Sequence, residues 1–295
     1  MKVEVQPGTY VIAVSGGVDS MVLLDILRKQ AGLKLVVAHF DHGIRHDSSI
    51  DRELVQQVAL KHGLSFVHHE GKLGPGASED TARKARYEFL HSIRRAANAR
   101  AILTAHHHDD VLETAVINML RGTNRKGITS LKSQVLIQRP LIDMEKQQLR
   151  QYAQDQGLVW REDSTNNDLR YLRNQVRYQL LPKLSANDRN KFQTIVRNMH
   201  RINEELDGHI LNYLHLQPTH DQLDRKEFIR LPHVVAREIM AGWLRKNSIS
   251  TFDQKMVERL VVAAKTFRSG GIVLINNDYK LRVTKGFLAL ERSDR

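Results

Sequence analysis

The stretch YVIAVSGGVDSMVLLDIL, residues 10–27, places a small polar loop directly between two apolar runs. Residues 10–14 have the β-branched composition of a buried strand, and the residues from Met21 onward have the spacing of a helix. Two glycines and two serines lie between these runs. A strand followed at once by glycines and a helix is typical of a loop whose backbone closely approaches a ligand.

The first half of the chain repeats this alternation. Four apolar runs have strand composition: residues 10–14, 34–38, 64–68 and 101–104. Each is followed by a segment with helical spacing: residues 21–30, 48–62, 78–97 and 110–120. Strands that alternate with helices form a parallel sheet, with helices on both faces. We therefore predict an α/β fold, a Rossmann-like parallel-sheet domain that binds its ligand beyond the carboxyl ends of the strands.

The second half is mostly helical after Pro140. Helical spacing covers residues 143–156, 173–181, 187–214, 225–247 and 252–267. Two β-rich runs, residues 271–275 and 279–292, flank Asn276-Asn277-Asp278 and predict a terminal β-hairpin. We predict two domains: the sheet domain over residues 1–184, and a smaller, mostly helical domain over residues 185–295 that ends in this hairpin.

The composition is strongly basic and lacks cysteine. The chain has 45 Lys+Arg against 33 Asp+Glu, a formal net charge of +12. Such a surplus favours a nucleic-acid partner, although a basic surface can also serve solubility alone. The absence of cysteine excludes disulfides, thiolate metal sites and cysteine nucleophiles. No segment approaches the ~20 apolar residues of a spanning helix, and no signal peptide is recognisable, so we expect a soluble, cytoplasmic protein without a membrane partner.

The loop of residues 15–20 has the composition of a phosphate-binding site. Glycines let the backbone approach an anion, serine hydroxyls donate hydrogen bonds, and the next helix contributes its free N–H groups. The loop lacks the lysine of a Walker A motif, and an ordinary helix cap is the alternative interpretation. We assign nucleotide phosphates to Ser15, Gly16, Gly17, Val18, Asp19 and Ser20. Asp19 would repel the phosphates unless a cation lay between them. We therefore predict that Asp19 is a ligand of Mg²⁺.

A second polar cluster, AHHHDDVLET at residues 105–114, directly follows the predicted strand 101–104. If a helix begins near Asp109, then Asp110 and Glu113 share one of its faces. The cluster fits acid/base chemistry or recognition of a substrate amine. Three histidines also allow a zinc site, which we disfavour because consecutive residues rarely point at one metal. A capped, solvated helix start is the third interpretation.

Five motifs in this order resemble the bacterial tRNA(Ile)-lysidine synthetase family, a branch of the PP-loop, or N-type, ATP pyrophosphatases. They are SGGVDS, DHGIR (residues 41–45), ARYEFL (85–90), AHHHDDVLET and RG (121–122). Three further segments, RPLI (139–142), EDSTN (162–166) and RYLRNQVR (170–177), are similar to that family's sequence at the end of its catalytic domain. The ordered set is far more specific than any one motif.

The resemblance implies a ligase that splits ATP to AMP and pyrophosphate. ATP would adenylate O2 of the wobble cytidine in CAU-anticodon tRNA(Ile), and the ε-amine of lysine would then displace AMP at C2 to form lysidine. It implies five catalytic residues: Asp19, Arg86, His106, Asp110 and Glu113. Asp19 and Arg86 would act on the phosphates, Asp110 and Glu113 would bind the lysine ammonium, and His106 would relay a proton or contact the adenylate. His39, directly after a predicted strand, joins the ATP-binding residues.

An arginine-rich connector supplies the predicted tRNA contacts. Arg170, Arg173 and Arg177 share one helix face, and we assign them to tRNA binding together with Asn174. A solvated cationic face is the alternative interpretation. The domain over residues 185–295 is also assigned to tRNA binding, and the resemblance suggests a homodimer.

Three other classes share parts of this pattern. A PP-loop tRNA thiolase would have the same phosphate loop, but its sulfur transfer typically uses cysteines, which this chain lacks. A glutamine-fed amidotransferase would add an ammonia-producing domain and would not need so basic a surface. A non-catalytic, nucleotide-dependent RNA-binding module would have no use for the five catalytic candidates.

Overall fold

The computed structural model describes residues 3–43, 48–71, 74, 79–123, 125–162, 169, 172–249 and 252–293. Contacts divide the chain into two compact units, Met1–Met199 and His200–Arg295. Helix α8, Ala186–His215, runs across this division. The domain boundary between residues 184 and 185, placed where the sequence motifs end, stays a prediction.

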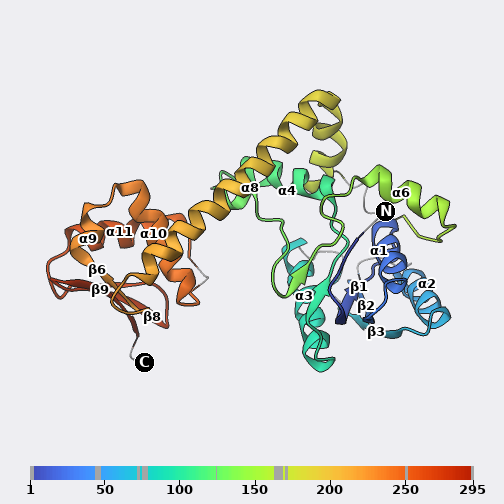
Figure 1. Ribbon diagram of the computed structural model, residues 1–295, viewed down its shortest axis with the longest axis horizontal. Helices are drawn as coiled ribbons and strands as arrows, with labels where there is room; N and C mark the ends of the chain where they lie inside the picture. The colour runs from blue at the N-terminus through green and yellow to red at the C-terminus, as the bar shows by residue number, and fades with distance from the viewer. Residues whose placement is uncertain are drawn as a thin grey trace. The chain divides into compact units, whose positions relative to one another are not determined.

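A five-stranded sheet in the order β3-β2-β1-β4-β5 forms the centre of the first unit (Figure 1). Every neighbouring pair is parallel, which confirms the predicted Rossmann-like fold. The strands are β1 (Gly8–Ala13), β2 (Leu33–Asp41), β3 (Ser65–Glu70), β4 (Ala101–Leu103) and β5 (Ile137–Gln138). The sequence pattern missed β5 because two residues are too short to show alternation.

Alternating side chains of β1 belong to two hydrophobic cores on opposite faces of the sheet. Tyr10 and Ile12 belong to a buried cluster with residues of α1 (Val18–Arg28), α2 (Ser48–Lys61) and α6 (Lys146–Asp155). Val11 belongs to a second cluster with α3 (Glu79–Ala96). Figure 1 shows α1 and α2 on one side of the sheet and α3 on the other. The sheet is therefore covered on both faces, as its apolar strands require.

Helix α4 (His108–Leu120) packs against the connector that precedes α8. Leu112 shares a buried cluster with Val176 and Val196. The short helix α5 (Arg125–Ile128) follows α4. The predicted helix 173–181 is a short α-helix, α7 (Leu172–Gln175), followed by a π-helical turn, Val176–Leu180, and a 3₁₀ turn, Leu181–Lys183. Such π-helical turns are common at functional sites.

The second unit packs helices on a four-stranded antiparallel sheet in the order β6-β9-β8-β7. Its strands are β6 (Gln222–Asp224), β7 (Ile272–Leu274), β8 (Tyr279–Val283) and β9 (Phe287–Arg292), and its helices include α9 (Arg225–Arg230), α10 (His233–Lys246) and α11 (Gln254–Thr266). The antiparallel β7–β8 pair confirms the predicted hairpin. None of the described helices is both long and apolar enough to cross a membrane.

Two details of the sequence prediction for the second unit are wrong. The segment 225–247 is two helices, because Pro232 has no N–H and forces Leu231 into an extended conformation with ψ of 138°. The run 279–292 is two strands, because Thr284 closes a turn by donating its backbone N–H to the Phe287 carbonyl at 2.9 Å.

Candidate active site

One pocket of the first unit brings together the two polar clusters that the sequence places after β1 and β4. Its volume is about 710 Å³, and its lining includes Ser15, Asp19, Arg86, Asp110 and Glu113. Strands β1 and β4 are neighbours, although two strands separate them in the chain. At such a switch point the loops that leave neighbouring strands diverge, and the crevice between them is the usual ligand site of this kind of sheet.

The glycine loop is held in shape by its own serines. The backbone N–H of Ser15 donates to Ser20 Oγ at 3.2 Å, and the Ser20 hydroxyl donates to the Gly17 carbonyl at 2.8 Å. Gly17 is the N-cap of α1 and has no side chain to bond the first free N–H groups of the helix, which include those of Val18 and Asp19. Those donors and the helix dipole are therefore available to an anion, as phosphate binding requires.

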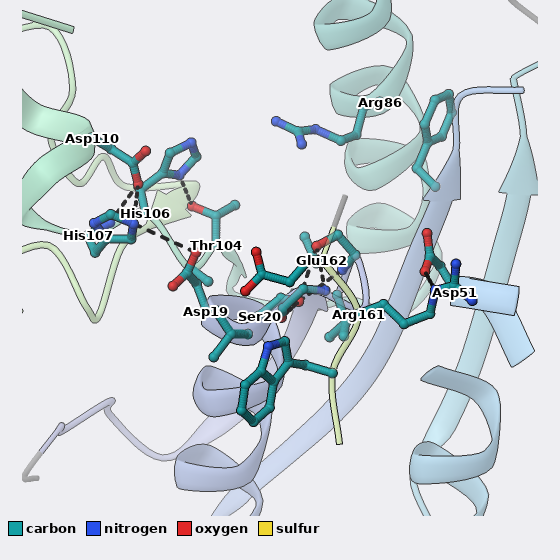
Figure 2. Close-up of a pocket in the computed structure, with 18 of the residues that line it drawn as sticks. Asp19, Ser20, Asp51, Arg86, Thr104, His106, His107, Asp110, Arg161 and Glu162 are labelled. Atoms are coloured by element: carbon teal, nitrogen blue, oxygen red, sulfur yellow. Dashed lines mark hydrogen bonds and ion pairs between the residues drawn. The ribbon is translucent and has the colours of Figure 1, made fainter. Parts of the chain in front are cut away.

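The segment at Arg161 also contacts the glycine loop. The backbone N–H of Arg161 donates to the Gly16 carbonyl at 3.0 Å, and Arg161 Nε lies 2.8 Å from Asp51 Oδ1 on α2. Figure 2 shows Arg161 and Asp51 together on one side of the pocket. Sequence reasoning missed both residues, because no local pattern connects Arg161 to a loop that lies so far back in the chain.

Asp19 is the acidic residue of the loop, and it is paired with a lysine. Lys146 Nζ lies 2.6 Å from each oxygen of Asp19. His107 Nε2 lies 3.7 Å from Asp19 and 3.5 Å from Asp110. His107 therefore lies between the acidic groups of the two predicted sites (Figure 2). His107 lies inside the predicted motif but had no predicted role, and no sequence pattern indicated Lys146, a basic residue in the first turn of α6.

Asp110 and Glu113 lie on one face of α4, as predicted, and both contact arginine. Helix α4 starts at His108, and its N-cap His107 donates its backbone N–H to Asp110 Oδ2 at 3.0 Å. Arg177 binds both oxygens of Glu113, at 2.6 and 2.8 Å, and reaches Asp110 Oδ1 at 3.3 Å. Arg173 Nε lies 3.2 Å from Glu113 Oε2. Arg173 and Arg177, which we predict to bind tRNA, thus contact Glu113, which we predict to bind lysine.

The carboxylates of Asp110 and Glu113 differ in how deeply they are buried. The side chain of Glu113 is 1% exposed and that of Asp110 is 13% exposed. Burial raises the pKa of Glu113, and the bidentate bond from Arg177 opposes that shift. Burial also disfavours the charged form of Asp110, but His107 and the backbone bond that it donates hold the pKa of Asp110 below its ordinary value. Asp110 is therefore the carboxylate that remains ionised and open to the pocket.

The other predicted residues lie on the walls of the same pocket. Burial lowers the pKa of His106 to about 3, so its imidazole is neutral near pH 7, and its Nδ1 lies 2.9 Å from Thr104 Oγ1. His39 is buried, its Nδ1 lies 2.9 Å from the Val14 carbonyl, and burial lowers its pKa. Figure 2 shows Arg86 reaching from α3 into the pocket.

Arg86 is a desolvated cation. Burial lowers the pKa of Arg86, but arginine starts so far above neutrality that the guanidinium stays charged at neutral pH. Its buried Nε has no hydrogen-bond partner among the described residues. A buried donor without a partner favours an anionic ligand at that position.

The remaining tRNA candidates differ in what the structure describes. Asn174 is buried and lines the pocket. Arg170 lies outside the described residues. Among the described residues, no group of three or more His, Asp or Glu side chains has the arrangement of a metal site.

Comparison with known proteins identifies the family. The family model of the PP-loop domain matches residues 2–184. A tRNA(Ile)-lysidine synthase from Exiguobacterium sibiricum is 31% identical over 290 residues, which cover 95% of this chain and 68% of that protein. Another from Nostoc sp. is 40% identical over 185 residues, which cover 60% of this chain and 54% of that protein. A third from Solibacter usitatus is 39% identical, over 59% of this chain and 40% of that protein.

Among solved structures, the U34-tRNA thiolase NcsA from Methanococcus maripaludis has a TM-score of 0.56 and 16% sequence identity, and the match covers 68% of this chain and 74% of that one. This likeness shows a shared fold. The Solibacter and Nostoc relatives are longer than their matches, which span 40% and 54% of their lengths. On the evidence of the family model and the Exiguobacterium relative, the chain belongs to the tRNA(Ile)-lysidine synthase family of PP-loop proteins.

Proposed function

We propose that this chain attaches lysine to C2 of the wobble cytidine of CAU-anticodon tRNA(Ile), and that it consumes ATP and releases AMP and pyrophosphate. One observation carries the proposal: the phosphate loop and the carboxylate pair line one pocket, with His107 between Asp19 and Asp110. The names of the relatives support the tRNA substrate.

The first step is transfer of AMP to the cytidine. The loop of residues 15–20 would hold the phosphates against the N-terminus of α1, so that cytidine O2 attacks the α-phosphorus and pyrophosphate leaves. The desolvated guanidinium of Arg86 would stabilise the charge that develops on the α-phosphate. His39 would hold the start of the loop in place, because its ring contacts the carbonyl of Val14, the residue directly before Ser15.

Mg²⁺ fits Asp19 as a single protein ligand. This ion commonly takes one or two carboxylates and completes its shell with substrate phosphates and water. Asp19 lines the pocket and is a quarter exposed, and its oxygens, which contact Lys146 Nζ, have further lone pairs for a metal ion. When bound, Mg²⁺ would neutralise charge on the phosphates.

The second step needs a neutral lysine amine. Free lysine has a pKa of about 10.4, so its ammonium must be bound and deprotonated in the site before it attacks C2 and expels AMP. We assign the ammonium contact to Asp110, the ionised and more open carboxylate, and to Glu113 beside it. Neutral His106 would contact the adenylate or pass on the proton.

tRNA binding would use Arg170, Arg173, Asn174 and Arg177 together with residues 185–295. Arg173 and Arg177 are 25% and 29% exposed, so one edge of each guanidinium can face the RNA while another holds Glu113. That the chain forms a homodimer stays a prediction. Sedimentation velocity would measure its oligomeric state.

The test is incubation with ATP, radiolabelled lysine and total bacterial tRNA. We expect stable label in one tRNA, with one AMP and one pyrophosphate released per lysine incorporated. Asp110→Asn should raise the KM for lysine and Glu113→Gln should lower turnover, each by at least about tenfold, as expected when a charged hydrogen bond is lost. Asp155→Asn, an exposed change on α6, is the matched control. Lysine-independent ATP turnover, or sulfur incorporation instead of lysine, would contradict the proposal.

A further inference from the structure

The phosphate loop lacks a lysine of its own, and the fold brings one to it from far along the chain. Lys146 and Asp19 are 127 residues apart in sequence, yet Lys146 Nζ lies 2.6 Å from both oxygens of Asp19. Both side chains line the pocket. In other phosphate loops a lysine next to the glycines contacts the β- and γ-phosphates. Lys146 has the charge and the location for the same task.

We propose that Lys146 is a polyphosphate-binding residue of this site, and that Asp19 positions its ammonium. The inference rests on the ATP-dependent function proposed above. An ammonium has three N–H donors, and the bonds to Asp19 account for two of them. The Lys146 side chain is 31% exposed, so the third donor can reach a ligand in the pocket. Phosphates at the N-terminus of α1 would lie next to Asp19 and hence next to Lys146.

The backbone of Lys146 is fixed, which makes this contact reproducible. Leu149 and Ala153 of α6 are fully buried in the core cluster that also contains α1. The Tyr152 hydroxyl donates to Asp25 Oδ2 of α1 at 2.8 Å. Helix α6 is therefore held on α1 at the level of its second turn, and only the Lys146 side chain needs to move toward a phosphate.

The alternative is that Lys146 only neutralises Asp19. Both possibilities predict weaker triphosphate binding when Lys146 is replaced, since an unpaired Asp19 would repel phosphate. They differ once Asp19 is neutral. If Lys146 contacts the phosphates, removing its charge weakens binding with or without a charged Asp19. If it only screens Asp19, removing both charges restores binding.

The experiment measures binding of α,β-methylene-ATP and of AMP by isothermal titration calorimetry, in EDTA and without tRNA or lysine. We expect Lys146→Met to weaken α,β-methylene-ATP binding by about ten- to a hundredfold, the loss of one charge-assisted contact, and to change AMP affinity by less than about threefold. Lys146→Arg should recover part of the loss. The double variant Asp19→Asn/Lys146→Met should still bind α,β-methylene-ATP more weakly than Asp19→Asn does.

A matched control uses a lysine–aspartate pair at the C-terminal end of α1. Lys29 Nζ lies 2.7 Å from Asp25 Oδ2 and does not line the pocket, so Lys29→Met should leave both affinities unchanged. Urea unfolding reports the folded fraction of each variant. Three outcomes would overturn the proposal: unchanged α,β-methylene-ATP binding by Lys146→Met, equal losses for both ligands, or a double variant that binds α,β-methylene-ATP as well as Asp19→Asn does. Because the assay contains no lysine or tRNA, its outcome is independent of whether lysine incorporation is observed.

Discussion

Gly16 and Gly17 are adjacent in the phosphate loop, but only Gly16 has a backbone conformation that requires glycine. Its φ is +95°, in the region that L side chains rarely adopt, and a Cβ there would lie 3.4 Å from the Asp51 Cβ. Gly17 has a φ of −75°, and a Cβ there would lie 3.5 Å from Ser15 Oγ, an ordinary contact. The two glycines therefore have different roles: one bends the loop, and the other keeps the helix N-terminus uncovered.

Replacing each glycine by alanine separates these roles. Gly16→Ala should lower the free energy of unfolding by about 1–2 kcal/mol, the cost of forcing an L residue into positive φ. Gly17→Ala should change it by less than about 0.5 kcal/mol, because the backbone there suits any residue. Urea unfolding of both variants and the wild type measures the difference. Equal effects of the two substitutions would contradict the assignment of strain to Gly16.

At the scale of helices, the pair α1 and α6 is joined by a cluster around Asp25. The side chain of Asp25 is 5% exposed, and it accepts hydrogen bonds from Lys29 at 2.7 Å and Tyr152 at 2.8 Å. Burial opposes ionisation of Asp25, but the bonds from Lys29, Tyr152 and Arg28 hold its pKa below the ordinary value of 3.8. The ionised form therefore binds its partners more strongly than burial penalises it.

This cluster predicts a pH dependence of stability. Because the folded pKa of Asp25 is depressed, its contribution is complete above about pH 4 and is lost as the pH falls through the folded value. We expect Asp25→Asn to lower the free energy of unfolding by about 1–2 kcal/mol at pH 7, a modest figure because Lys29 is partly exposed. The difference from wild type should shrink toward zero as the pH falls through the depressed folded pKa of Asp25.

Urea unfolding of both proteins between about pH 2 and 7 measures this difference, and Asp155→Asn serves as the exposed control on α6. A difference that stays constant down to the lowest pH would mean that Asp25 acts through shape rather than charge.

For the whole molecule, the surplus of 45 basic over 33 acidic residues predicts electrostatic tRNA binding, but the charges are not equivalent. Arg173 and Arg177 share the buried carboxylate Glu113. Lys183 and Arg197, in contrast, are exposed residues of the connector and of α8. A cation already paired with a carboxylate releases fewer counterions from RNA than an exposed one does.

Salt titrations of tRNA binding should distinguish the two pairs. Lys183→Ala/Arg197→Ala should make the slope of log K against log salt shallower by about 1–2, because each phosphate contact contributes about 0.7 to 0.9. Arg173→Ala/Arg177→Ala should lower affinity with a smaller change of slope. Filter binding between about 50 and 300 mM salt gives both slopes. An unchanged slope for the exposed pair would exclude those two residues from the tRNA contact.

The linear sequence was sufficient for the sheet and for the residues after its strands. The apolar run before Ser15 and the helical spacing after Ser20 predict β1, α1 and the loop between them, because local periodicity reports which face is buried. The same reasoning found Asp110 and Glu113 on one face of α4. It failed where a single residue ends a helix, as Pro232 does between α9 and α10. It also failed where a strand such as β5 is too short to show alternation.

Only the tertiary structure decided which side chains pair across the pocket. Lys146 with Asp19, Arg161 with Asp51 and Arg177 with Glu113 are contacts between segments more than 60 residues apart. No periodicity links such segments, since they meet only when the folded sheet brings the helices and loops around its strand ends together. The sequence by itself determined the fold and the residue types of the site, because burial patterns are local. The counter-ion of each carboxylate was decided by the folded chain, because charge pairing depends on distance in space.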